Sequence, residues 1–266
     1  MERPPPVIVK LGGSVLTRKR RVEALRPKVL HRLAAELAAS TAPVIVLHGA
    51  GSFGHPGAQR FGLAKPPEPG RSPEERRRGA AIVSAEVRRL HLEVLRALVA
   101  AGDRPWSVPA ATVAANRAGR LDALDLTPFR SSLSAEMRPV SFGDVVPDTE
   151  WAHSILSADA IAVELVRRLG VRRVLFLSDV EGIYDPAPSA KRKVVEEVSE
   201  GLVARLKPES SGPDVTGGIR GKAESMLAIS ALGADAGLIS GLKDGSLSRA
   251  LRGERVFGSW TTPSPR

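Results

Sequence analysis

Cysteine is absent from the 266-residue sequence. This absence excludes disulfide bonds, thiolate metal sites and cysteine nucleophiles together. The histidines are scattered without an H-E-x-x-H pair, so no resident metal site is expected and any metal should arrive with a substrate. The chain also lacks an apolar run of about 18 residues or more, and residues 1–6 lack the apolar centre of a signal peptide. We therefore expect a cytoplasmic protein that does not enter a membrane.

Aromatic residues make up only 4% of the chain, although its net charge is +10. A basic surface attracts nucleic acids, but single-stranded bases usually stack on aromatic side chains, which are scarce here. The arginine clusters at 76–78, 88–89 and 167–168 lie in segments with helical spacing, which is typical of a solvated helix face. The charge pattern therefore favours steering of small anionic substrates over binding of nucleic acid.

Strand-like and helix-like segments alternate along the chain. Apolar runs predict buried strands at 7–11, 44–47, 174–177 and 236–240. Helical spacing predicts helices at 22–39, 73–101, 157–169, 221–232 and 247–251. Between them we expect an exposed loop at 65–75, and short strands, turns and a hairpin at 106–146.

This alternation is typical of an α/β fold in which helices cover both faces of a sheet. We predict a three-layer αβα sandwich with a mostly parallel central sheet. No repeat or flexible linker divides the chain, so residues 1–266 should form a single domain. Within it we expect a substrate-binding N-terminal half, approximately 1–172, and a nucleotide-binding C-terminal half, approximately 173–266.

Two of the expected strands end in glycine-rich turns, KLGGS at 10–14 and HGAGSFGH at 48–55. Glycine allows the backbone to approach a ligand closely, and consecutive free N–H groups at such a turn attract anions. The carboxyl ends of neighbouring parallel strands meet at one crevice. The two turns therefore predict a shared phosphate site.

Two common nucleotide motifs are excluded. Residues 49–54 match G-x-G-x-x-G, but a dinucleotide site also needs an acidic residue after a strand about 20 residues further on. That region is rich in proline and glycine, and no Walker A sequence is present. Phosphates must be held in another way.

Several further motifs follow in order along the chain. They are Lys19, FGDVV at 142–146, LSAD at 156–159, LSDVEGIYD at 177–185 and DVTGGIRGK at 214–222. With the two glycine turns they resemble the amino acid kinase superfamily over nearly the whole chain, and GSFGH resembles its isopentenyl phosphate kinase branch. The resemblance implies the amino acid kinase fold, ATP as phosphoryl donor with Mg²⁺ carried by the nucleotide, a small phosphorylated prenyl acceptor, and a homodimer.

The resemblance also implies the site residues. The catalytic set is Lys10, Lys19, His55, Asp159 and Lys222. The ATP-binding set is Lys10, Leu11, Gly12, Gly13, Ser14, Gly51, Asp179, Gly182, Tyr184, Asp185, Gly217, Gly218 and Lys222. The acceptor-binding set is Ala50, Gly54, His55 and Gly143. Such a reaction needs positioning and charge neutralisation rather than a covalent nucleophile.

His55 indicates the acceptor class, because the resemblance makes it a hydrogen-bond donor to the acceptor phosphate. Residues 61–63 and 82–98 offer apolar side chains for a prenyl tail. A fosfomycin-type phosphonate kinase, whose glycine loop also carries the histidine, and a non-catalytic binding or storage protein on the same fold are the alternatives. Lys19 also fits a charged surface turn, and Tyr184 fits a core position.

Ala50 departs from the pattern, because glycine is commoner at this position of the motif. Alanine does not adopt a positive φ cheaply. The path of the backbone at Ala50 therefore decides whether the loop keeps its expected shape.

Overall fold

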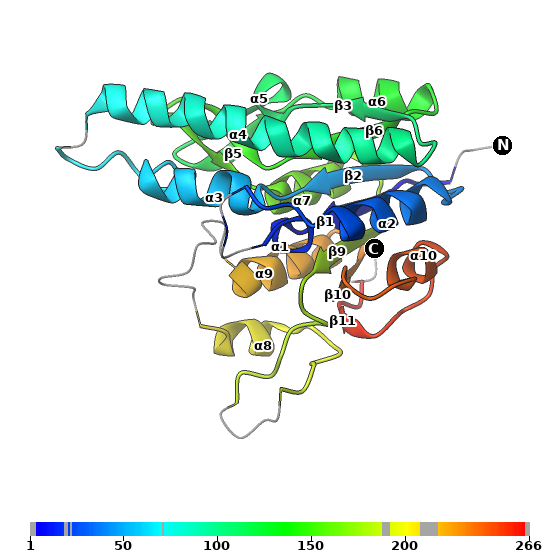
Figure 1. Ribbon diagram of the computed structural model, residues 1–266. Coiled ribbons are helices and arrows are strands. Elements are labelled where there is room, and N and C mark those ends of the chain that lie inside the picture. Colours follow the sequence, from blue (N-terminus) through cyan, green and yellow to red (C-terminus); the bar gives the residue numbers. More distant parts are fainter. Residues whose placement is uncertain are drawn as a thin grey trace.

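The computed structural model describes residues 4–18, 21, 23–70, 72–187, 192–207 and 218–263 (Figure 1). Two of the predicted site residues, Lys19 and Gly217, lie outside these ranges. The described strands form a seven-stranded sheet and a four-stranded sheet.

The seven-stranded sheet forms the middle of the molecule. In spatial order its strands are β11 (Gly258–Trp260), β10 (Asp235–Ser240), β9 (Arg173–Ser178), β1 (Val7–Leu11), β2 (Val44–His48), β6 (Arg138–Phe142) and β3 (Pro105–Ser107). Only the β10–β11 pair is antiparallel. The mostly parallel sheet is therefore confirmed, and the carboxyl ends of β1, β2, β6 and β9 lie at one edge.

Helices cover both faces of this sheet (Figure 1). The helices on one face are α2 (Pro27–Ala38), α4 (Pro73–Ala100) and α10 (Ser246–Leu251). Those packed into the core of the other face include α6 (Thr127–Ser134), α7 (Ala158–Leu169), α8 (Glu200–Arg205) and α9 (Gly218–Ala231). This arrangement confirms the predicted αβα sandwich.

Strand alternation decides where Lys10 points. Val9 and Leu11 of β1 pack into the core under α2 and α4, whereas Ile8 packs into the core under α7 and α9. Side chains two residues apart share a face of a strand. Lys10 therefore faces the α7 and α9 side, at the carboxyl end of β1.

The four-stranded sheet is built from strands before and after β6 and has the order β5 (Arg120–Leu124), β4 (Ala114–Arg117), β7 (Asp144–Asp148) and β8 (Ala152–Leu156). A third apolar cluster joins β7 to α4 and to α3 (Gly51–Arg60), and includes Phe61, Val83 and Phe142. No helix built from the described residues is long and apolar enough to cross a membrane.

One predicted helix has the wrong beginning. We expected a helix at 22–39, but α2 begins at Pro27, after the short helix α1 (Gly13–Leu16). An isolated bridge pairs Thr17 with Leu25. Proline has no amide hydrogen and suits the first turn of a helix, so Pro27 marks the true start.

Other elements were not predicted individually. The region 106–146 contains the expected hairpin, β4 with β5, and also α5 (Ala110–Val113), α6 and strand β6 of the seven-stranded sheet. Strands β8 and β11 and helices α1, α3 and α8 were not predicted either, and α3 begins inside the second expected glycine turn. The expected helix at 221–232 is α9, whose described part begins at Gly218. The strands predicted at 7–11, 44–47, 174–177 and 236–240 and the helices predicted at 73–101, 157–169 and 247–251 agree with the structure within one or two residues at each end.

Candidate active site

Glycine residues follow three neighbouring strands and join them at their carboxyl ends. The Gly12 N–H donates to Leu177 O at 2.9 Å, and the Gly49 N–H donates to Leu11 O at 3.0 Å. Gly143, after β6, repeats the pattern with an N–H that donates to the last residue of β2 at 3.0 Å. These bonds continue the parallel pairing beyond the strands and hold the glycine turns in one layer at the sheet edge.

The first two glycine turns are in direct contact. A Cβ added to Gly13 would lie 2.4 Å from the Gly51 N atom, and Gly51 itself has a φ of +51°. The buried Thr17 hydroxyl connects them, because it donates to Gly13 O at 2.8 Å and accepts from the Ser52 N–H at 2.9 Å. A residue with a side chain at Gly13 or Gly51 would separate the two turns.

Ala50 fits this arrangement. It has a φ of −72° and a ψ of −27°, which are ordinary helical values, so alanine is accommodated without strain. The positive φ falls on Gly51, where a side chain would be strained. The departure from glycine at position 50 therefore does not disturb the loop.

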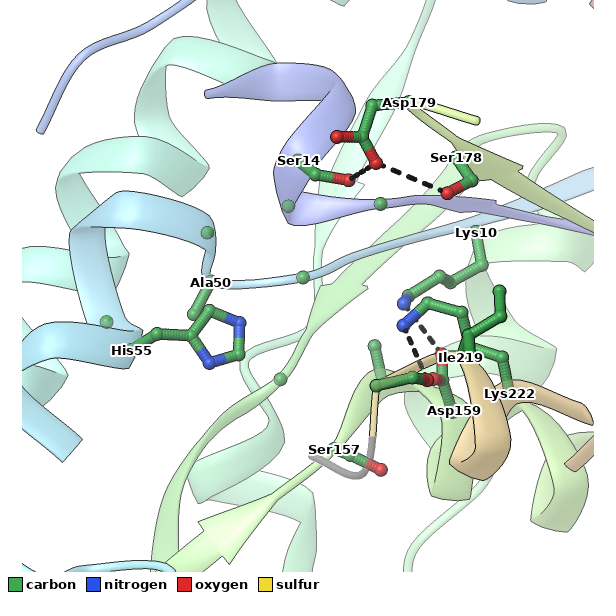
Figure 2. A pocket seen from close by; sticks show the side chains of 18 of the residues that line it. Lys10, Ser14, Ala50, His55, Ser157, Asp159, Ser178, Asp179, Ile219 and Lys222 are labelled. Atoms are coloured by element: carbon green, nitrogen blue, oxygen red, sulfur yellow. Dashed lines mark hydrogen bonds and ion pairs between the residues drawn. The ribbon is translucent and has the colours of Figure 1, made fainter. Parts of the chain in front are cut away.

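Two lysines and one aspartate converge from three elements on the α7 and α9 face. Lys10 Nζ lies 2.7 Å from Asp159 Oδ1, and both side chains are less than one tenth exposed. Asp159 lies in the first turn of α7, which Ser157 caps by accepting from the Ala160 N–H. Figure 2 shows Lys222, from α9, pointing toward the same carboxylate. The carboxylate thus fixes positive charge at the carboxyl end of β1.

A single cavity of about 310 Å³ contains most of the predicted site. Its lining includes Lys10, Gly12, Gly13, Ser14, Ala50, Gly51, Gly54, His55, Gly143, Asp159, Asp179, Gly182, Tyr184, Gly218 and Lys222. In Figure 2 His55 reaches in from α3, on the side of the cavity away from the lysines. Two predicted residues, Leu11 and Asp185, are not part of the lining: the Leu11 side chain is buried in the core, and Asp185 contacts Arg205.

The loop after β9 contributes a carboxylate, Asp179, and one aromatic ring, Tyr184, to the cavity. Ser14 Oγ donates to Asp179 Oδ1 at 2.6 Å. Tyr184 is half-buried, lines the cavity, and lies under the Arg192 guanidinium at 5.0 Å from the ring centre. Within the described ranges no group of three or more histidine or acidic side chains is arranged to hold a metal ion.

The other part of the cavity is apolar. Ala58 from α3, Val83 and Val87 from α4, and Ile155 from β8 line it. The expected segments 61–63 and 82–98 do meet here, but Phe61 and Leu63 lie behind the wall, in the third apolar cluster. Ile155 was missed, because β8 was not predicted.

Asp144 is a lining residue that sequence reasoning left out of the site. It is buried and pairs with Arg88 of α4, whose two terminal nitrogens lie 3.1 Å from its two oxygens. Burial raises the pKa of the Asp144 carboxyl, and the Arg88 charge acts in the opposite direction. The position of Asp144 inside the FGDVV motif was the available signal, but its partner lies 56 residues away.

Comparisons with known proteins agree with this geometry. Residues 5–238 match the model of the amino acid kinase family. The isopentenyl phosphate kinase of Methanothermobacter thermautotrophicus is 33% identical over 96% of this chain and 98% of that protein. That of Thermoplasma acidophilum is 35% identical over 83% of this chain and 85% of that protein.

Solved structures give the same result. An X-ray structure of isopentenyl phosphate kinase superposes with a TM-score of 0.84 at 31% identity, and covers 97% of this chain and 100% of that one. A substrate complex of isopentenyl phosphate kinase superposes with a TM-score of 0.76 at 28% identity, over 96% and 99% of the two chains. The chain therefore belongs to the amino acid kinase family, and its resemblance to the isopentenyl phosphate kinases is confirmed.

Proposed function

We propose that this chain transfers the γ-phosphoryl group of ATP to isopentenyl phosphate, giving ADP and isopentenyl diphosphate. One observation carries the proposal: a single cavity places Lys10 and Lys222 opposite His55 and continues between apolar side chains of α3, α4 and β8. Two phosphorylated molecules can meet in it with their phosphates between the lysines and His55. The relatives that match over most of the chain carry this activity in their names.

The transfer follows from charge and position. An oxygen of the acceptor phosphate bonds to the γ-phosphorus while the bond from that phosphorus to the β,γ-bridging oxygen breaks, and ADP leaves with the bond electrons. The reacting groups are all anionic, so fixed positive charge supplies most of the rate enhancement. Lys10 and Lys222 provide this charge, and Asp159 positions Lys10 by their 2.7 Å contact.

The glycine turns act on the same phosphates. Gly12, Gly13 and Gly51 present backbone at the cavity surface without side chains, so phosphate oxygens can approach it closely. The Gly12 N–H already donates to Leu177 O, so the amides of Gly13 and Gly51 are the ones that can bind phosphate oxygens. His55 donates a hydrogen bond to the acceptor phosphate and thereby selects a phosphorylated acceptor. Lys19, Gly217, Leu11 and Asp185 stay predictions of the resemblance.

Asp179 is the carboxylate that fits a Mg²⁺ ion carried by the nucleotide. Mg²⁺ prefers oxygen ligands and usually takes only one or two protein carboxylates. Asp179 lines the cavity beside Ser14 and accepts a hydrogen bond from the Ser14 hydroxyl. The two side chains together offer oxygen atoms to the ion. When bound, the ion would neutralise nucleotide phosphate charge.

The apolar wall favours a prenyl acceptor over a small polar phosphonate. Val83, Val87 and Ile155 would cover an isopentenyl tail and remove it from water. Fosfomycin would leave that surface uncovered. Homodimer formation, a cytoplasmic location and the division into a substrate half and a nucleotide half stay predictions.

Coupled detection of ADP tests the function. With Mg²⁺ and ATP, we expect ADP to form on addition of isopentenyl phosphate, and far more slowly with fosfomycin, with isopentenol or without an acceptor. ADP formation with fosfomycin but not with isopentenyl phosphate would contradict the proposed acceptor. Nucleotide binding without any acceptor-dependent ADP would mean a non-catalytic protein.

A pair of lysine variants controls the assay. Lys222→Met removes an ammonium group from the cavity and should lower kcat by about 100-fold or more. Lys28→Met changes an exposed lysine of α2 and should leave kcat unchanged. Equal rates for the two variants would contradict the role of Lys222.

A further inference from the structure

A line of three polar side chains runs behind the glycine turn that follows β2. His48, the last residue of β2, is fully buried, and its Nε2 lies 3.0 Å from Nδ1 of the buried His91 in α4. His91 Nε2 lies 2.7 Å from Oγ of Ser107 in β3, an exposed residue. At the other end, His48 Nδ1 lies 3.1 Å from the backbone oxygen of Gly49.

Both rings are held in place and uncharged. Phe142 packs against them, with ring centres 5.2 Å from His48 and 4.3 Å from His91. Burial lowers the pKa of His48 to about 4 and that of His91 to about 3. At neutral pH each ring therefore carries a single N–H, and each has one nitrogen that donates and one that accepts.

The carbonyl at the end of the line fixes the direction of every bond in it. A carbonyl oxygen only accepts, so His48 must carry its hydrogen on Nδ1, and its Nε2 must accept. His91 must then donate from Nδ1, and its Nε2 must accept from the Ser107 hydroxyl. The hydrogen bonds run in one direction, from Ser107 through the two rings to Gly49.

The Gly49 carbonyl and the Ala50 N–H belong to one peptide group, whose residues both line the cavity. The described residues offer the Ala50 amide no hydrogen-bond acceptor. A peptide that accepts a hydrogen bond at its oxygen becomes a stronger donor at its nitrogen, and a chain of such bonds strengthens the effect. The line thus ends on a peptide group in the wall of the cavity.

We propose that Ser107, His91 and His48 form a positioning chain that fixes and polarises the Gly49–Ala50 peptide, so that the Ala50 amide binds the acceptor phosphate. The inference rests on the proposed function, because it takes the acceptor to be a phosphate monoester. None of the three side chains lines the cavity, so they act through the peptide. Packing alone would require the buried rings but no particular tautomer.

Nitrogen-15 NMR of histidine-labelled wild-type protein tests the direction without substrate. Two-bond nitrogen–proton correlations distinguish the two neutral tautomers. We expect Nδ1–H for both His48 and His91 at pH 7. An Nε2–H tautomer at His48 would overturn the proposal, because the Gly49 carbonyl would then have no donor from the ring.

Two variants of His48 separate its two contacts. In His48→Asn the side-chain amide takes the place of Nδ1, so it retains the donor to Gly49. In His48→Gln the amide reaches the place of Nε2, so it retains the contact with His91 and loses that donor. Thermal unfolding of each variant checks that it is folded.

We expect His48→Gln to raise the KM for isopentenyl phosphate by about tenfold and leave the KM for ATP within about twofold. His48→Asn should raise the acceptor KM by less than about threefold. Equal changes in the two variants, or a larger change in His48→Asn, would overturn the proposal. A different result is wild-type protein that shows the expected tautomers and yet forms no acceptor-dependent ADP. That result would contradict the proposed function, and with it the role of the positioning chain in acceptor binding.

Discussion

Asp159 brings a buried lysine, Lys10, and a half-buried lysine, Lys222, to one carboxylate. Isolated buried charges are costly, and removing one partner of a buried pair typically costs about 3–5 kcal/mol. Lys10 Nζ is held at 2.7 Å, and Lys222 points to the same carboxylate. The charge is therefore fixed before substrates bind, and little reorganisation is needed during transfer.

His55 is the residue that should distinguish a phosphorylated acceptor from other acceptors. Replacing it with alanine removes a donor to a charged phosphate, which is worth about 1.5–3 kcal/mol, or about 10- to 150-fold. We expect His55→Ala to lower kcat/KM for isopentenyl phosphate by about 100-fold, and His55→Gln, which keeps a donor, to retain part of the activity. Steady-state kinetics of the two variants checks this.

The control for His55 is structural. Thermal unfolding should be similar in the two variants, because His55 is only half-buried. Wild-type kcat/KM in both would remove His55 from the acceptor site. If kcat/KM falls in both variants in proportion to a loss of folded protein, His55 would instead have a role in stability.

The two glycine turns act as one element, because their backbones touch. In Gly13→Ala the new Cβ would lie 2.4 Å from Gly51 N and 2.5 Å from Gly51 Cα, and backbone atoms cannot move aside cheaply. Overpacking of this kind costs about 1–3 kcal/mol. We expect a lower melting temperature and at least a tenfold loss of kcat, measured by calorimetry and the ADP assay.

Gly201→Ala is the matched control for that variant. Gly201 lies on the exposed side of α8, and a Cβ there meets only Ser199 Oγ, at 3.9 Å. Alanine is favoured over glycine in a helix by about 0.5–1 kcal/mol. The control should keep full activity and unfold at the same or a slightly higher temperature. Unchanged activity in Gly13→Ala would contradict the contact between the turns.

Much of the fold could be predicted from local sequence, because the strands at 7–11, 44–47, 174–177 and 236–240 are rich in apolar residues. Strand β6 could not. Its first residues, Arg138 and Pro139, do not resemble a buried strand, yet Arg138 is buried through an ion pair with Asp103 and a 3.0 Å bond to Leu37 O. Those partners come from distant segments, so no local pattern shows them.

The candidate site was predicted where a motif carries it. Lys10, His55 and Asp159 lie in short motifs and were placed in one cavity as expected. The apolar wall and the Arg88–Asp144 pair depend on how α4 lies against β7 and β8, which only the folded chain determines. The positioning chain behind Gly49 is of the same kind, because His48 and His91 are 43 residues apart.

The two buried histidines give the whole molecule a pH dependence. Their folded-state pKa values of about 4 and about 3 lie below the value of about 6.5 in an unfolded chain. As the pH falls, these histidines therefore bind protons in the unfolded chain at a higher pH than in the folded protein. Their contribution to the free energy of unfolding is fully present above about pH 6.5 and falls by about 1.4 kcal/mol per pH unit for each histidine below it.

Urea denaturation between pH 7.5 and pH 5 checks this dependence. The wild-type free energy of unfolding should fall as the pH decreases through this range. His91→Gln removes one of the two rings. It should lower the slope of the free energy of unfolding against pH by about half. An unchanged slope in the variant would contradict the assignment of the pH dependence to these histidines.

Phosphorus NMR of the complete reaction follows the chemistry of the whole molecule. With Mg²⁺, ATP and isopentenyl phosphate, the phosphate monoester signal should disappear as two coupled diphosphate-ester signals grow, in amounts equal to the ADP formed. A monoester signal that persists while ATP is consumed, or no consumption of either, would contradict transfer between two phosphorylated substrates in this cavity.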